Sequence, residues 1–148
     1  MIELDRMSVV RPGLHHVALT VTDLDASIAW YGRVFGLTMQ LEAPHTGGVG
    51  LLLTDDDWRL IIVLHRHETN KAEPFSETRT GLDHVGFGVP TRADLVAWQS
   101  HLEANGVKRA DEADRPLTQS AIADTPYGSL LVFRDPDNIQ LELYSPPL

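Results

Sequence analysis

Apolar and polar positions alternate along a short stretch near the start of the chain, from 16 to 21. There Val17, Leu19 and Val21 share one face, which predicts a strand with one buried side. The spacing then changes, because apolar residues between 24 and 35 recur every three or four positions, as on an amphipathic helix. Gly36 follows as the expected helix stop. Alternation returns in three further predicted strands, at 38–43, 49–54 and 58–65.

The same order of elements is predicted again in the second half. A strand at 83–89 precedes a helix at 92–104. Residues 107–123 have no clear period, and the last two strands are predicted at 129–134 and 139–144. Each half therefore has the order βαβββ, which indicates an α+β protein. We expect the two modules to pair into a cup-shaped mixed sheet with the helices outside.

An internal repeat supports this division. The stretch 13–21 is identical to the stretch 81–89 at five of nine positions, with an offset of 68 residues. His16 corresponds to His84, and each is followed 14 residues later by a tryptophan. A repeat of this length means that one supersecondary unit is used twice. The predicted organisation is an arm, a first module, a linker and a second module, at 1–12, 13–65, 66–80 and 81–148.

The face of each sheet that the helices do not cover carries the candidate chemistry. Alternation places His16, His84 and Glu142 on this face, and pairing of the modules would turn it toward a shared concavity. Two neutral imidazoles and one carboxylate form a facial set with open positions, which suits non-haem Fe(II), Mn(II) or a related divalent ion. Open positions are typical of a catalytic or ligand-binding metal rather than a structural one.

Two plainer interpretations remain open for these residues. A histidine at the start of a strand is usually an ordinary surface histidine, and Glu142 could simply face solvent on an edge strand. Alignment of the modules puts Ile61 opposite Glu142, so three protein ligands are expected rather than four. Ile61, His65 and Tyr127 are candidates for lining the pocket. The other histidines are expected on the surface, namely His15, His45, His67 and His101.

Charge and composition exclude several classes of function. The chain has 12 basic and 21 acidic residues, a net charge of −9, which argues against nucleic acid and against an anionic membrane surface as partners. It has no cysteine, so disulfides and thiolate metal sites are excluded. No apolar run is long enough to span a bilayer. The first six residues carry acids and no apolar core, so we expect no signal peptide and a cytoplasmic location.

Two motifs resemble a known family. The run His16–Val21, followed by Thr22-Asp23-Leu24-Asp25, Ala29-Trp30-Tyr31 and Phe35-Gly36-Leu37, resembles the opening module of the vicinal oxygen chelate superfamily. The run Phe133–Leu143 resembles its closing strands, so the resemblance covers about 13–145. It implies paired βαβββ modules around a divalent ion (Fe, Mn, Co, Ni or Zn), a small-molecule substrate and a homodimer. The superfamily's metal ligands fall on His16, His84 and Glu142.

Differences between this chain and individual members of the superfamily reduce the number of reactions that it could catalyse. Glyoxalase I and methylmalonyl-CoA epimerase use a fourth ligand, Glu or Gln, where the alignment puts Ile61 in this chain. Extradiol dioxygenases and fosfomycin-resistance enzymes use two His and one Glu, but the latter carry a Thr where this chain has Ala18. The leading hypothesis is a metal-dependent enzyme that chelates vicinal oxygens at a dioxygenase-like site. The alternatives are a non-catalytic drug- or metabolite-binding protein of the bleomycin-resistance type and a glyoxalase-like lyase or isomerase.

Overall fold

Each of the two sheets begins with the strand that follows a candidate histidine. The computed structural model describes residues 8–147, so the first part of the predicted arm, 1–7, lies outside the described residues, as does Leu148. The first sheet has the strand order β1-β4-β3-β2, with β1 parallel to β4 and the other pairs antiparallel. Its elements are β1 (Val17–Thr20), α1 (Leu24–Phe35), β2 (Thr38–His45), β3 (Gly48–Thr54) and β4 (Ile61–His67).

The second sheet repeats this plan with additional short strands. Its order is β5-β10-β9-β7-β6, with β8 paired to β9, and β5 is parallel to β10. The elements are β5 (Val85–Gly88), α2 (Arg92–Ala104), β6 (Lys108–Arg109), β7 (Thr118–Gln119), β8 (Ala123–Thr125), β9 (Gly128–Arg134) and β10 (Gln140–Ser145). The stretch without a clear period thus contains β6, β7 and the start of β8. The predicted α+β class and the repeated order of elements are confirmed.

Local sequence signals explain why both helices have the predicted bounds. The Asp23 carboxylate accepts a hydrogen bond from the Ala26 N–H and so caps the start of α1. Gly36 ends α1 with φ of 66°, a left-handed conformation that glycine adopts without strain. Thr91 and Asp94 form a reciprocal capping box at the start of α2.

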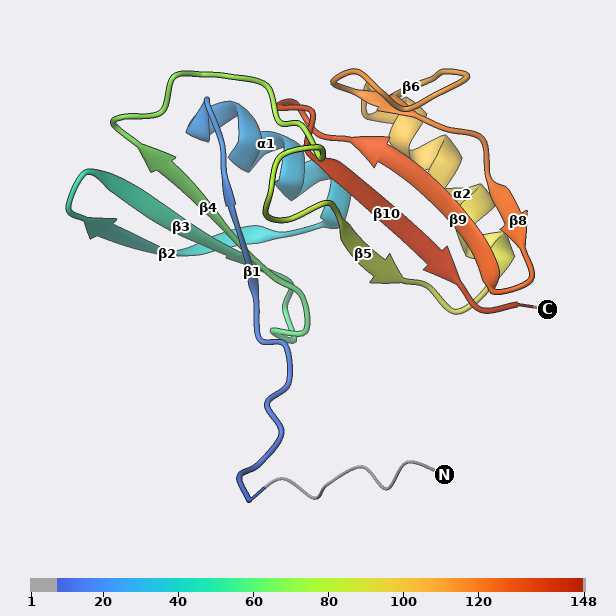
Figure 1. Ribbon diagram of the computed structural model, residues 1–148, viewed down its shortest axis with the longest axis horizontal. Coiled ribbons are helices and arrows are strands. Elements are labelled where there is room, and N and C mark those ends of the chain that lie inside the picture. Colours follow the sequence, from blue (N-terminus) through green and yellow to red (C-terminus); the bar gives the residue numbers. More distant parts are fainter. Residues whose placement is uncertain (1–7, 148) are drawn as a thin grey trace.

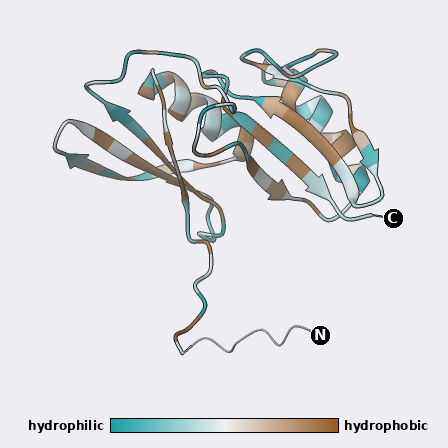
Figure 2. Ribbon diagram, viewed as in Figure 1, coloured by the Kyte–Doolittle hydropathy of each residue, from teal (hydrophilic) through white to brown (hydrophobic). Residues whose placement is uncertain are grey.

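A single apolar core joins the two halves through α1. Figure 1 shows α1 between the two sheets, and α2 packs on β9 and β10. The Trp30 and Phe133 rings are 6.3 Å apart, and the Phe35 and Phe87 rings 4.9 Å apart, so α1 contacts the second sheet as well as its own. Figure 2 shows the alternation along β10 as bands, and its inward residues Leu141 and Leu143 are almost fully buried.

Polar contacts from α1 and from the residue Thr22 before it connect the two halves. The fully buried Tyr31 hydroxyl donates a hydrogen bond to Asp135 Oδ2 at 2.7 Å. Asp135 Oδ1 also accepts from the N–H groups of Asp137 and Ile139. Burial raises the pKa of Asp135 to about 6, although the bond from Tyr31 opposes that rise. The Thr22 N–H donates to Asp137 Oδ2 at 3.1 Å. The turn after β9 is therefore the polar anchor for α1.

The strand β4 continues to His67, two residues into the range predicted as a linker. The chain from 68 to 84 then crosses to the second sheet, where the Phe75 N–H donates to the Asp137 carbonyl. Glu77 accepts two hydrogen bonds from the buried guanidinium of Arg134, which lowers the pKa of Glu77 to about 2. Within residues 8–147, no helix is long and apolar enough to cross a membrane.

The strand registers correct one detail of the internal alignment. Val17 pairs with Ile62 in the first sheet, and Val85 pairs with Leu141 in the second. The position equivalent to Glu142 is therefore Val63, so the predicted equivalence of Ile61 and Glu142 is wrong by two residues. The connection between β3 and β4 has six residues (55–60) and that between β9 and β10 has five (135–139), which accounts for one residue of this shift.

Replacement of Tyr31 by Phe should destabilise the fold. At pH 7.5 Asp135 is mostly ionised, and removal of its buried hydroxyl donor should lower the free energy of unfolding by about 1.5–3 kcal/mol. Tyr144→Phe is the control, since that hydroxyl donates to the Tyr127 carbonyl at an exposed position and its loss should cost under about 0.5 kcal/mol. Urea unfolding curves measure both values, and equal losses would contradict this account of the anchor.

Candidate metal centre

The parallel pair β5 and β10 brings two of the predicted ligands together. Glu142 pairs in register with Gly86, and alternation puts His84 on the same face as Gly86. His84 Nε2 lies 3.8 Å from Glu142 Oε2. A side-chain carbon added at Gly86 would meet no atom within 4 Å, so the sheet face beside this pair is open. The two side chains therefore line an accessible surface of the second sheet.

Asp83 sets the orientation of the His84 ring. Its Oδ1 atom lies 2.8 Å from His84 Nδ1. A carboxylate only accepts hydrogen bonds, so Nδ1 carries the hydrogen. In neutral His84 the lone pair is then on Nε2, on the side of Glu142. Histidines that bind metals typically donate their other ring N–H to a carboxylate in this way. The role of Asp83 was not predicted from the sequence. Two signals pointed to it, because Asp83 is adjacent to His84 and the corresponding residue of the twin stretch 13–21 is His15 rather than an acid.

Glu142 is the more enclosed partner of the pair. Its side chain is 18% exposed, on the face of β10 opposite to the buried side chains of Leu141 and Leu143. Its carboxylate makes no hydrogen bond within residues 8–147. The alternative that Glu142 faces solvent on an edge strand does not hold, because β10 lies between β5 and β9. An enclosed carboxylate that faces an imidazole lone pair favours a cation between them.

His16 occupies a different position from this pair. It ends an exposed segment, 8–16, which Figure 1 shows running away from the two sheets. Its Nδ1 atom lies 2.8 Å from Nδ1 of His15. In the described part of the chain, one group of three potential ligands has its ligand atoms within 4.8 Å of one another, and that group does not include His16. A single copy therefore brings His84 and Glu142 together without His16.

That group is a three-histidine cluster on the first sheet, formed by His45 of β2 with His65 and His67 of β4. His45 Nε2 lies 3.2 Å from His65 Nδ1, and the rings of His45 and His67 are 5.2 Å apart. His45 and His67 were expected only as surface residues and His65 as a pocket residue. The i, i+2 spacing of His65 and His67 showed that they share a face, but the place of His45 depends on the register across β3.

The surroundings of the three-histidine cluster alter the pKa of His65. Burial lowers the pKa of His65, and the nearby imidazoles of His45, His67 and His16 lower it further. Neutral imidazole is thus favoured at His65. The cluster lines an open depression of about 510 Å³ together with Ala18 and Thr20.

The other two pocket candidates lie elsewhere. Ile61 is 6% exposed at the start of β4. Tyr127 is 82% exposed in the turn between β8 and β9. Neither belongs to the depression beside the three histidines.

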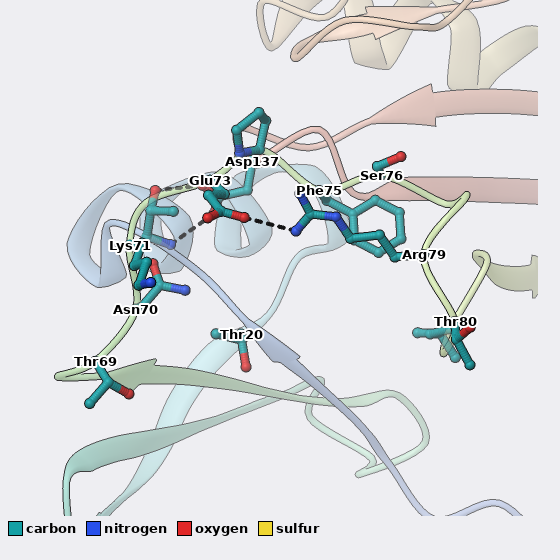
Figure 3. A pocket seen from close by; sticks show the side chains of 13 residues that line it. Thr20, Thr69, Asn70, Lys71, Glu73, Phe75, Ser76, Arg79, Thr80 and Asp137 are labelled. Carbon is teal, nitrogen blue, oxygen red and sulfur yellow. Dashed lines mark hydrogen bonds and ion pairs between the residues drawn. The ribbon is translucent and has the colours of Figure 1, made fainter.

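A second cavity, of about 420 Å³, lies between β1 and the 68–84 segment (Figure 3). Arg79 and Glu73 form an ion pair of 2.9 Å at its wall, so these two charges offset each other. The candidate ligands His16, His84 and Glu142 are absent from its lining. The cavity therefore does not coincide with the candidate metal centre.

Comparison with known proteins assigns the chain to a family. Residues 13–143 match the family described as the Glyoxalase/Bleomycin resistance protein/Dioxygenase superfamily. The chain belongs to this superfamily. A glyoxylase/bleomycin resistance protein/dioxygenase domain from Frankia sp. EAN1pec has a similar structure, with a TM-score of 0.78 and 31% identity over 93% of each chain.

Two further proteins are similar to this chain at lower identity. The uncharacterized protein YaeR of Escherichia coli (strain K12) is 29% identical over 139 residues, which cover 88% of this chain and 94% of YaeR. A fosfomycin resistance protein, FosX, from Listeria monocytogenes, crystallised with Mn(II) and sulfate, has a TM-score of 0.60 and 18% identity over 94% of this chain and 96% of its own. At that identity the likeness concerns the fold alone. The family match over residues 13–143 confirms the predicted superfamily.

Proposed function

We propose that this chain is a divalent-metal-dependent enzyme of the glyoxalase/dioxygenase type that binds vicinal oxygens of a small substrate. The observation that carries the proposal is the arrangement of Asp83, His84 and Glu142 on the open face of β5 and β10. An imidazole whose lone pair is held toward a carboxylate 3.8 Å away is a donor set for a cation. Superfamily membership supplies the context but does not define the reaction.

The donor set fits a divalent ion. Nitrogen and oxygen ligands that lie about 2.0–2.2 Å from an ion are roughly 3.0–3.5 Å from each other, so the observed separation needs a closure of only a few tenths of an ångström. In this role Asp83 would keep the proton on His84 Nδ1, and Glu142 would supply negative charge. The ion would act as a Lewis acid and as a template for two neighbouring substrate oxygens.

The third proposed ligand is His16 from a second copy of the chain. Within one copy His16 does not join the His84–Glu142 pair, and it ends an exposed segment. That segment presents apolar side chains to solvent, with Val10 91% and Leu14 92% exposed. An isologous dimer would cover these side chains and form two equivalent centres.

Val63 favours a site with three protein ligands. It occupies the position in the first sheet that is equivalent to Glu142, and an isopropyl group cannot bind a metal. Three ligands leave room for a bidentate substrate and one further small ligand, as a dioxygenase-like site requires. The proposed reaction class is therefore oxygen-dependent cleavage of the aromatic ring of a catechol, whose two neighbouring hydroxyl groups would bind the ion.

Mn(II) should stabilise the folded protein through the carboxylate-containing site. Mn(II) prefers oxygen-rich sites, so it should discriminate against the three-histidine cluster. At a hundredfold excess over the Kd, the expected gain is about 2.7 kcal/mol in the free energy of unfolding. His84→Ala and Glu142→Gln should each abolish the gain, whereas Asp114→Asn, which alters an exposed acid, should retain it. If the wild type shows no gain with Mn(II) or Fe(II), the non-catalytic binding-protein hypothesis replaces this proposal.

The reaction class can be tested by oxygen dependence. The Fe(II)- or Mn(II)-loaded protein should turn over catechols in air and not under anaerobic conditions, with oxygen uptake measured at an electrode. A panel of 2-oxoaldehyde–thiol adducts serves as the comparison. Turnover of the adducts without oxygen, and none of the catechols, would instead support a glyoxalase-like lyase or isomerase.

Mixing two inactive variants should test the shared site. His16→Ala and His84→Ala each remove a ligand, so neither homodimer should bind Mn(II) tightly. After random exchange of subunits, half of the dimers are mixed and each mixed dimer has one complete site, so about a quarter of all sites should be restored. Electron paramagnetic resonance of bound Mn(II) measures this fraction. Absence of recovery in a mixture that light scattering shows to be dimeric would contradict the placement of His16.

A further inference from the structure

We propose that His45, His65 and His67 form a second divalent-metal site, separate from the His84–Glu142 pair and independent of the proposed function. The cluster lies on the first sheet, on strands β2 and β4, whereas the proposed catalytic pair lies on the second. The chemistry of the ligands also differs, because the cluster offers three imidazoles and no carboxylate. The two sites should therefore select different ions.

Distances within the cluster suit a tetrahedral ion. Two nitrogen ligands about 2.05 Å from Zn(II) are separated by roughly 3.3 Å, and His45 Nε2 lies 3.2 Å from His65 Nδ1. The His67 ring is the third member, and ligand atoms of all three residues lie within 4.8 Å of one another. Small side-chain rotations would bring His67 to the same centre.

The strand pairing presents these rings on one face. Gly48 of β3 pairs with both His45 and His67, and Gly50 pairs with His65. A side-chain carbon at Gly50 would lie 2.6 Å from the His65 ring, and one at Gly48 would lie 2.8 Å from the His45 ring. These two glycines leave the space over β3 that the imidazoles occupy. The cluster is therefore built into the sheet.

The tautomer of His45 matches that of a metal ligand. Its Nδ1 atom lies 3.1 Å from the Thr46 carbonyl, which can only accept, so Nδ1 carries the hydrogen. The Nε2 lone pair then points to the cluster. A hydrogen bond from the other ring nitrogen to a backbone carbonyl is the usual support for a ligating histidine.

A hydrogen bond between His45 and His65 explains only part of this arrangement. It would use one nitrogen of each ring. The His67 ring makes no hydrogen bond within residues 8–147, although it lies beside both other rings. A shared ion would use all three side chains.

The ligand set favours Zn(II), with Cu(II) and Ni(II) as competitors. Imidazole suits these ions, and three protein ligands leave one position of a tetrahedral ion for water or a small ligand. That position would face the open depression beside Thr20.

Zn(II) titration of the untagged full-length protein by calorimetry tests the proposal. The wild type should show a Zn(II) site that His65→Ala and His67→Ala each weaken by about 100-fold, since loss of even an outer partner of a metal ligand costs about 10–100-fold. Gly50→Ala keeps all three ligands but displaces the His65 ring, so it should weaken binding as well. His84→Ala should leave this site intact, and each variant's fold is checked by circular dichroism.

The Co(II) spectrum provides a second readout. Co(II) at the cluster should give the intense visible bands of a four-coordinate ion in the wild type and in His84→Ala, and not in His65→Ala. Failure of the proposed catalytic site would leave this signal unchanged, so the two proposals can fail separately. Zn(II) binding that is insensitive to His45→Ala, His65→Ala and His67→Ala, or lost only in His84→Ala, would overturn the second site.

Discussion

Parallel pairing between the first and last strand of each module is the constraint on which the candidate chemistry depends. It places β5 beside β10, so that a histidine just before one strand meets a glutamate in the middle of the other. The same pairing places β1 beside β4. Such pairing needs a long crossover, and the helix together with the antiparallel strands of each module provides it. Loss of this register by one residue would turn Glu142 from the open face into the core.

The hydrogen bond between Tyr31 of α1 and Asp135 connects the first module to the second. Tyr31 reaches Asp135 in the turn that leads into β10, so a helix of the first module is bonded to the connection that precedes the strand with Glu142. Apolar packing of Trp30 on Phe133 reinforces the contact. The core thus occupies the helix side of both sheets, and the opposite faces remain open for ligands.

Much of this arrangement could be predicted from the sequence. The helix bounds followed from caps that can be recognised locally, namely Asp23, Gly36 and Thr91. The repeat identified His16 and His84, and alternation put Glu142 on the open face. The equivalence of Ile61 was wrong by two residues, and the one-residue difference between the connecting loops, which strand patterns do not reveal, accounts for one of them.

The three-histidine cluster could not be predicted from the sequence for a related reason. His45 comes close to His65 only through the register of β2, β3 and β4, which depends on the hairpin turn at 46–47. The supporting role of Asp83 likewise requires the ring orientation of His84. Both features are side-chain geometry, and local sequence patterns determine strands more directly than they determine contacts across a sheet.

The proposed metal centre would join His84 and Glu142 to His16 of a second copy. Anomalous X-ray diffraction from crystals grown with Mn(II) tests it most directly. The account predicts a Mn(II) peak about 2.0–2.3 Å from His84 Nε2 and a Glu142 oxygen, with a His16 imidazole from the neighbouring subunit completing the set. Mn(II) held elsewhere, with no peak between His84 and Glu142, would contradict it.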